Sequence, residues 1–273
     1  MAESRKVVNL LGAAGVALFA LTGGALADGY AGSVKDAPAE EGRKFTYSFS
    51  ITGTSDYVFR GISQTDDDPT IQGAINVGYG IFYAGAWGSG LDFGDDPAVN
   101  GSEAQVEIDW YGGIKPTWGK ATFDFGVIYY TYPGANDFAA ELDYVELKAG
   151  VSGEVFDKLT AGAVAYYSPE YTGKLGEVWT FEGTLAYALP KFWVFDPIVS
   201  GLVGYEFGQD PVFNGALSDN YTYWNAGVAL VVEKITLDFR YWDTDLETGG
   251  LCAATGPFQC DERFVFSATV ALP

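Results

Sequence analysis

The sequence predicts an all-β fold: a transmembrane antiparallel up-and-down β-barrel of about 12 strands, with short periplasmic turns and longer external loops. Three observations predict it. The 273-residue chain opens with a segment that has the pattern of an export signal, the rest alternates between polar and apolar residues, and short and long connections take turns along it. Aromatic residues make up 16% of the chain and charged residues only 19%, which fits strands that face lipid.

The first 27 residues are expected to form a secretory signal peptide. Arg5 and Lys6 supply its positive charge, Val7–Leu21 its apolar stretch, and Ala25–Ala27 the small residues of a cleavage site after Ala27. An uncleaved membrane anchor is the alternative, but the 15 apolar positions fall short of the roughly 20 residues that span a bilayer. The predicted organisation is a signal peptide at 1–27, a flexible periplasmic N-terminal tail at 28–43 and an outer-membrane β-barrel at 44–273.

Alternation with period two dominates the chain from Phe45 onward, and no comparable helical pattern appears. The segment Ser102–Gly112 is the clearest, because Ala, Val, Ile and Trp alternate there with Glu, Gln, Glu and Asp. Segments of roughly ten residues match the length that a tilted strand needs to cross a bilayer. Twelve strands are predicted to start near residues 45, 70, 81, 102, 120, 142, 159, 176, 193, 221, 235 and 262.

The connections differ in length in the way that an outer-membrane barrel requires. Short ones are expected near Gly80, Lys115–Gly119, Gly153–Lys158, Pro190–Phe192 and Glu233–Lys234. Longer, often acidic ones are expected at Thr65–Pro69, Gly94–Gly101, Pro133–Glu141, Pro169–Gly176, Gln209–Asn220 and Thr244–Asp261.

A secreted, soluble β-sandwich also alternates, and it is the competing fold. Its polar face would carry many lysines, whereas the polar face here is mostly Ser, Thr, Gly, Asn and isolated carboxylates. Aromatic residues also gather near the predicted strand ends, as they do in the interfacial girdles of membrane barrels. These are Tyr57, Phe59, Tyr79, Trp110, Tyr129, Trp179, Tyr187, Phe207, Trp224 and Tyr241.

Charge and composition exclude several functions. A formal charge of −21 is incompatible with electrostatic docking on nucleic acid, which needs Lys and Arg. The chain has no histidine, so Ser-His-Asp and Cys-His catalysis and imidazole metal sites are excluded. We expect no enzymatic activity, no catalytic residues, no cofactor and no metal site.

Charged residues on the polar faces are the main functional signal, because rings of charge select ions in pores. A carboxylate-rich lumen predicts a pore that prefers cations. The alternative is a plugged lumen, in which Arg60, Lys148 and Arg240 bridge carboxylates in a structural network. The predicted pore-lining residues are Asp56, Arg60, Glu103, Glu107, Asp109, Asp124, Glu146, Lys148, Glu182, Glu206, Asp238 and Arg240.

Two further features concern the loops. Cys252 and Cys260 lie in the last long loop of an exported chain, so we expect a disulfide between them. Acidic runs such as Asp66–Asp68 and Asp95–Asp96 make the outer loops negative, without the spacing of a calcium loop. Solvated loop charge explains them; divalent cations bridging them to lipopolysaccharide are the alternative.

A family resemblance supports the same location. The stretch Thr54–Ser63 (TSDYVFRGIS), with the Gly73–Tyr79 strand and the Ala86–Ser89 step, resembles the TorF-like family of proteobacterial porins. The resemblance covers the chain from about Phe45 to Pro273 and implies an exported outer-membrane barrel without identifying the solute that it passes.

The sequence therefore predicts passive diffusion of small hydrophilic, preferentially cationic solutes across a Gram-negative outer membrane. Expected partners are these solutes or ions, outer-membrane lipid, lipopolysaccharide and the outer-membrane assembly machinery. The alternative is a non-conducting barrel with a structural or surface-binding role.

Overall fold

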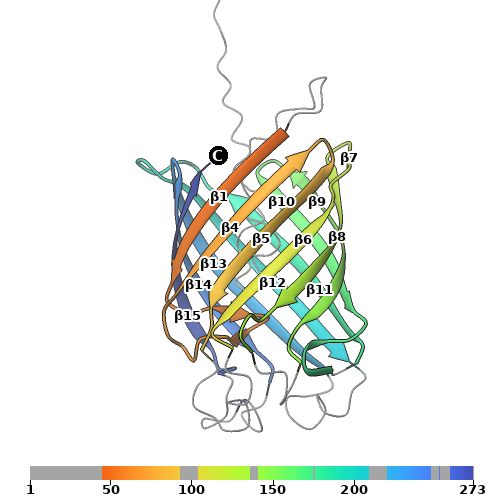
Figure 1. Ribbon diagram of the computed structural model, residues 1–273. Coiled ribbons are helices and arrows are strands. Elements are labelled where there is room, and N and C mark those ends of the chain that lie inside the picture. The colour runs from red at the N-terminus through yellow and green to blue at the C-terminus, as the bar shows by residue number, and fades with distance from the viewer. Residues whose placement is uncertain are drawn as a thin grey trace, which may run out of the picture.

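The computed structural model describes residues 45–92, 104–135, 141–174, 176–208, 220–246, 252 and 259–272. They form a closed antiparallel barrel of twelve long strands (Figure 1). The strands are β1 (Phe45–Thr54), β4 (Thr70–Tyr79), β5 (Phe82–Gly90), β6 (Val106–Ile114), β8 (Ala121–Thr131), β9 (Tyr144–Phe156), β10 (Leu159–Ser168), β11 (Val178–Ala188), β12 (Asp196–Gly208), β13 (Asn220–Val232), β14 (Ile235–Thr244) and β15 (Arg263–Leu272).

Each long strand pairs with the next one along the chain, and two contacts complete the ring. Strand β1 pairs with β15, with Phe49 opposite Leu272, and β6 pairs with β8 across the short strand β7 (Thr117–Trp118). The prediction of a twelve-strand antiparallel barrel is confirmed, and every predicted strand start lies within a few residues of an observed one. One turn is corrected: β9 continues to Phe156, so the predicted turn at Gly153–Lys158 shrinks to Asp157 and Lys158.

The barrel turns its apolar residues outward, the reverse of a soluble protein. In β1, Phe45, Tyr47, Phe49 and Ile51 are exposed, while the intervening Thr and Ser side chains point to the lumen. The same outward apolar pattern recurs on the other long strands. A hydrocarbon layer is the environment in which this arrangement hides apolar surface. Within the described ranges, the chain has no helix that could span a bilayer.

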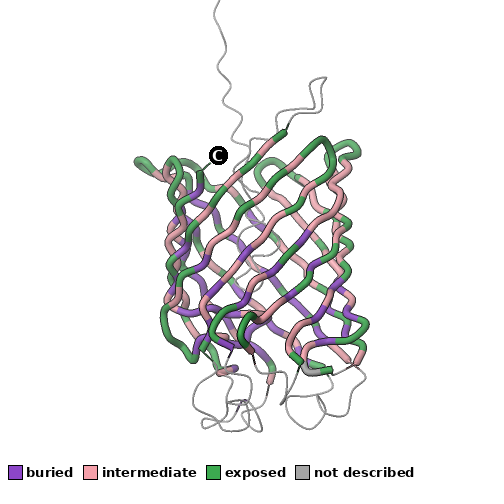
Figure 2. The backbone as a smooth tube through the Cα atoms, viewed as in Figure 1, coloured by how far each residue is buried: buried purple, intermediate pink, exposed green. Residues whose placement is uncertain are grey.

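The two ends of the barrel differ. We call the end with the connections Gly80–Ile81, Asp157–Lys158 and Glu233–Lys234 the short-turn end, and the opposite one the long-loop end. Buried residues are most frequent toward the long-loop end, as the purple segments of Figure 2 show, and on β11 to β13 a smaller buried cluster of Ala186, Ile198 and Ala229 lies near the short-turn end. In β1 the inward residues run from partly exposed Thr46 to buried Thr54. Something therefore fills the lumen at the long-loop end.

Candidate functional site

A hairpin folds into the lumen at the long-loop end. It comprises residues 55–69, between β1 and β4, and contains the paired strands β2 (Val58–Phe59) and β3 (Ile62–Ser63). We call it the lumenal hairpin; Figure 1 shows it in orange inside the lower end of the barrel. The predicted outer connection Thr65–Pro69 covers only the end of this segment, where Asp66–Pro69 are exposed. The prediction that Tyr57 and Phe59 belong to an interfacial girdle is wrong, because Tyr57 is buried and Phe59 packs beside it in the same apolar cluster.

The chain turns back at Arg60 and Gly61. Their φ angles are 49° and 86°, and Phe59 pairs with Ile62 on either side. Two consecutive left-handed residues make the tight turn that suits a two-residue hairpin, and glycine accepts this conformation without steric cost. Arg60 does not have that freedom, and a left-handed non-glycine residue costs about 1–2 kcal/mol. The contacts of its side chain offset this cost.

The Arg60 guanidinium lies between two carboxylates from distant strands. Its Nη2 donates to both carboxylate oxygens of Glu146 on β9 at 2.8 Å, and Nη1 donates to Oε2 of Glu206 on β12 at 2.7 Å. Nη1 also lies 3.5 Å from the hydroxyl of Tyr171. The rings of Phe59 and Tyr166 lie 4.7 and 5.3 Å from the guanidinium carbon, within the range of cation–π attraction. We call these five contacting residues, together with Arg60, the Arg60 site.

Neutral hydroxyls hold the two carboxylates in position. The hydroxyl of Tyr130 donates to Oε2 of Glu146 at 3.0 Å, and that of Thr180 donates to Oε2 of Glu206 at 2.8 Å. Arg60, Glu146 and Glu206 are all nearly inaccessible to solvent, at 4%, 1% and 2% exposure. Charges this deeply buried persist only where they are paired and hydrogen-bonded.

Apolar contacts seat the rest of the hairpin. Val58 and Ile62 pack in one cluster with wall residues of β12, β13 and β14 and with both cysteines. On the other side, Tyr57 stacks edge-on against Trp87 of β5 and donates its hydroxyl to Glu107 of β6 at 2.9 Å. The hairpin therefore contacts wall strands on both sides of the lumen. The wall residues of the first cluster are Leu202, Tyr221, Tyr223 and Trp242.

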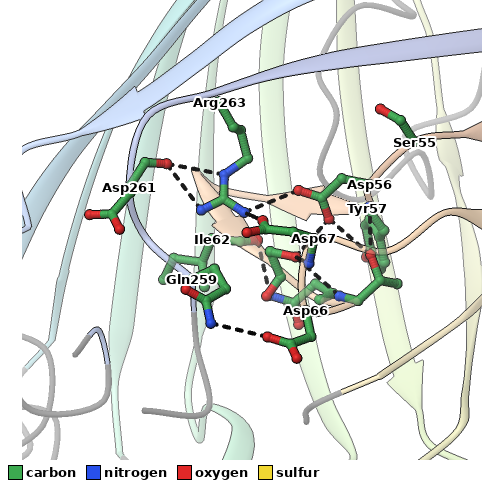
Figure 3. A network of polar contacts seen from close by, with 12 residues as sticks. Ser55, Asp56, Tyr57, Ile62, Asp66, Asp67, Gln259, Asp261 and Arg263 are labelled. Atoms are coloured by element: carbon green, nitrogen blue, oxygen red, sulfur yellow. Dashed lines mark hydrogen bonds and ion pairs between the residues drawn. The ribbon is translucent and has the colours of Figure 1, made fainter. Parts of the chain in front are cut away.

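Arg263 ties down the base of the hairpin (Figure 3). Its guanidinium contacts the carboxylates of Asp56, at 3.1 Å, and Asp67, and it donates twice to the backbone oxygen of Asp261. Gln259 adds a hydrogen bond to Asp66 at 3.0 Å. Burial raises the pKa of the Asp67 carboxyl, and the nearby carboxylates of Asp56, Asp66 and Asp261 add to this against the lowering effect of Arg263. Arg263 is therefore the cation that offsets a repulsive group of acids.

The predicted lumen residues divide into three groups. Asp56 and Arg60 belong to the lumenal hairpin and not to a wall strand. Glu103 lies outside the described residues. The others lie on the inner face of the wall, although whether they line a conducting pore stays a prediction; these are Glu107, Asp109, Asp124, Glu146, Lys148, Glu182, Glu206, Asp238 and Arg240.

Three further cation–carboxylate contacts lie along the lumen. Lys148 lies 3.0 Å from Asp124, and Lys115 lies 3.5 Å from the same carboxylate. The Arg240 guanidinium donates to both oxygens of Asp238 at 3.0 Å. Several of the predicted carboxylates are thus paired with a basic side chain, and Lys115 is a cation that the predicted set did not include.

Cys252 and Cys260 form the predicted disulfide. Both sulfurs belong to the apolar cluster that receives Val58 and Ile62. The bridge therefore supports the lumenal hairpin as well as closing its own loop. No group of three or more potential metal-ligating side chains occurs in the described part of the chain.

Sequence reasoning missed the residues that complete the site. Tyr166 and Tyr171 look like ordinary strand-end aromatics, and Arg263 looks like an isolated charge before the last strand. One local signal was available, namely the Arg-Gly dipeptide between Val58-Phe59 and Ile62-Ser63, since glycine in such a position indicates a tight hairpin.

Comparisons with known proteins agree with the fold and assign a family. The "KdgM porin" structure matches with a TM-score of 0.54 and 8% identity, covering 83% of this chain and 99% of that one. The NanC porin matches with a TM-score of 0.54 and 10% identity, covering 82% and 99%. At this identity the likeness concerns the fold alone. No curated protein matches the chain.

A family model described as "Bacterial protein of unknown function (Gcw_chp)" matches residues 38–271. The resemblance to the TorF-like porins drawn from the TSDYVFRGIS stretch is not confirmed by this match. Because the model spans nearly the whole barrel, the chain belongs to the Gcw_chp family of bacterial proteins of unknown function.

Proposed function

We propose that this protein is an outer-membrane porin of a Gram-negative bacterium, which passes small hydrophilic solutes and prefers cations. The observation that carries the proposal is the two-faced barrel, with apolar residues outside and polar or charged residues inside. In this proposal the short-turn end faces the periplasm, and the signal peptide is removed after Ala27. Lipid and lipopolysaccharide surround the barrel, and the outer-membrane assembly machinery inserts it. The proposal includes no catalytic group and no cofactor.

The charges of the lumen support cation preference. Arg60 faces two carboxylates, so one formal negative charge is left over at the Arg60 site. A surplus of fixed negative charge in a narrow passage concentrates cations and repels anions. The hairpin makes the passage narrow at the long-loop end.

Single-channel recording tests the proposal. The purified, refolded protein is placed in a planar bilayer under a potassium chloride gradient, and the current and reversal potential are measured. We expect small, stable current steps with a reversal potential on the cation-selective side. A folded barrel that passes no current under any applied voltage would contradict the proposal.

A matched pair of variants tests the lumen charges. Asp124→Asn removes the negative charge that contacts both Lys115 and Lys148 in the partly exposed part of the lumen. We expect its reversal potential to move toward the anion-selective side. Glu154→Gln removes a carboxylate paired with Lys120 in a well-exposed contact at the short-turn rim. That control should leave the reversal potential close to the wild-type value, because exposed rim charges are screened by salt. Equal shifts in the two variants would contradict a lumen filter at Asp124.

A second candidate function is a non-conducting barrel with a structural or surface-binding role. The hairpin favours it, because its side chains contact wall strands on both sides of the long-loop end. The same recording separates the two candidates. A silent wild-type protein that conducts once the hairpin is unseated would be a plugged barrel.

A further inference from the structure

The Arg60 site has the chemistry of a receptor for a guanidinium group. One side supplies the two-oxygen edge of Glu146, another supplies Oε2 of Glu206, and the ring of Tyr166 lies 5.3 Å from the guanidinium carbon. Planar, two-pronged hydrogen bonding to a carboxylate and contact with an aromatic ring are how proteins recognise guanidinium compounds. All of these groups lie on long wall strands, so they stay in place whatever the hairpin does.

Two observations indicate that Arg60 does not saturate the site. One guanidinium faces two carboxylates, so one formal negative charge is left over. In addition, the hydroxyl of Ser168 is completely buried and has no hydrogen-bond partner within the described structure. Ser168 follows Tyr166 on the same face of β10, and continuing the β9–β10 register places it opposite Glu146. A buried hydroxyl beside the carboxylate is an unused polar contact.

Arg60 differs from Glu146, Glu206 and Tyr166 in its place in the fold. It belongs to a two-residue turn rather than to a wall strand, and its left-handed backbone is strained. Releasing the guanidinium would remove only side-chain contacts of the turn, because Glu146, Glu206 and Tyr166 are held by the wall strands. The three wall residues therefore form a preformed binding site, and the guanidinium of Arg60 on the hairpin is the group that a solute can replace.

We propose that Glu146, Glu206 and Tyr166 form a recognition site for solutes that carry a guanidinium group, and that Arg60 occupies it until such a solute displaces it. This inference rests on the proposed porin function, because the solute must reach the lumen. Displacement would also break the contacts of Arg60 with Glu146 and Glu206 and so release the tip of the hairpin. A solute that fits the site would therefore widen the lumen through which it passes.

The test uses propylguanidinium as the probe and propylurea, which has a similar shape but no charge, as the control ligand. Thermal unfolding midpoints of the detergent-purified protein are measured against ligand concentration. The proteins are the wild type, Arg60→Ala, and the triple variant Arg60→Ala/Glu146→Gln/Glu206→Gln. The triple variant differs from Arg60→Ala only in the two carboxylates, which glutamine replaces at nearly the same volume. It is therefore the matched control for binding that depends on the charge of the site.

We expect propylguanidinium to raise the midpoint of Arg60→Ala at a concentration at least about tenfold lower than for the wild type, because Arg60 competes in the latter. The wild type should still respond, whereas the triple variant and propylurea should show no shift. A wild type that does not respond while Arg60→Ala does would overturn the proposal, since the mutation alone would then have created the site. Where Arg60→Ala does not fold, Arg60→Lys replaces it, because lysine keeps the charge but lacks the planar fork.

Current recordings in the same probe separate this inference from the porin proposal. A midpoint shift in a protein that never conducts would keep the recognition site and refute the porin. A conducting protein whose midpoint and current both ignore propylguanidinium would keep the porin and refute the site.

Discussion

At Gly61 the backbone is left-handed, and it passes so close to the wall that a side chain has no room. A Cβ atom there would lie 2.9 Å from Cβ of Tyr223 and even closer to Thr244. Both neighbours stand on wall strands, so neither can move away cheaply. This single position therefore determines whether the tip of the lumenal hairpin can be seated.

We expect Gly61→Ala to destabilise the seated hairpin by about 2–4 kcal/mol, combining backbone strain and overpacking. Denaturant unfolding of the protein in lipid vesicles measures the change, and the variant should also carry more current. Gly119→Ala isolates the backbone strain, because Gly119 has a φ of 63° and nothing within 4 Å of its Cβ position; its cost should be about 1 kcal/mol. Equal costs at Gly61 and Gly119 would contradict a tightly seated tip.

The strands were predictable from the sequence, whereas the lumenal hairpin was not. Alternation is a local property, so the face of each residue in β1 or β8 follows from its neighbours in the chain. The hairpin depends instead on contacts such as Arg60 with Glu146, 86 residues apart, and Arg263 with Asp56, 207 residues apart. No periodicity connects residues at those separations. The inward positions of Glu107 and Glu146 could be read from the sequence, but their partners could not.

The disulfide between Cys252 and Cys260 is the one covalent link in the apolar cluster of described residues that holds Val58 and Ile62 of the hairpin. It closes a loop of small sequence separation, 8 residues, and packs in the cluster of Val58 and Ile62. Replacing both cysteines by alanine should lower the unfolding free energy by about 2–3 kcal/mol, as the chain-entropy model gives for a short loop. Unfolding with and without reductant measures this, and reductant should have no effect on the double variant. A wild type whose unfolding free energy is the same with and without reductant would show that the disulfide does not stabilise the protein.

At the scale of the whole molecule, the barrel is defined by the difference between its two faces. Ser50 and Ile51 are adjacent in β1 and point to opposite faces, with Ile51 65% exposed on the outside. The same side chain introduced at each position therefore meets lipid in one case and the lumen in the other. This makes the pair a direct test of the membrane assignment.

We expect Ile51→Arg to lower the stability of the folded barrel in lipid vesicles by about 2–4 kcal/mol, the cost of a charge on the lipid face near mid-bilayer. Ser50→Arg should fold nearly as well as the wild type, because its charge lies in a polar lumen. The fraction of protein that migrates in the folded, heat-modifiable form on gels measures both. Equal losses, or a larger loss for Ser50→Arg, would contradict the assignment of faces.

The position of the lumenal hairpin in the chain also constrains how the barrel is made. Its residues follow the first strand, yet its contacts reach β5 and β6 on one side and β9, β12, β13 and β14 on the other, and its base is held by Arg263 at the start of the last strand. The wall surface that the hairpin contacts is not complete until most of the barrel strands have paired. Seating is therefore a late event of biogenesis, close to the moment when β1 meets β15. An intermediate with an unjoined seam lacks the contact between Arg263 and Asp56, so the hairpin narrows the lumen fully only once the barrel has closed.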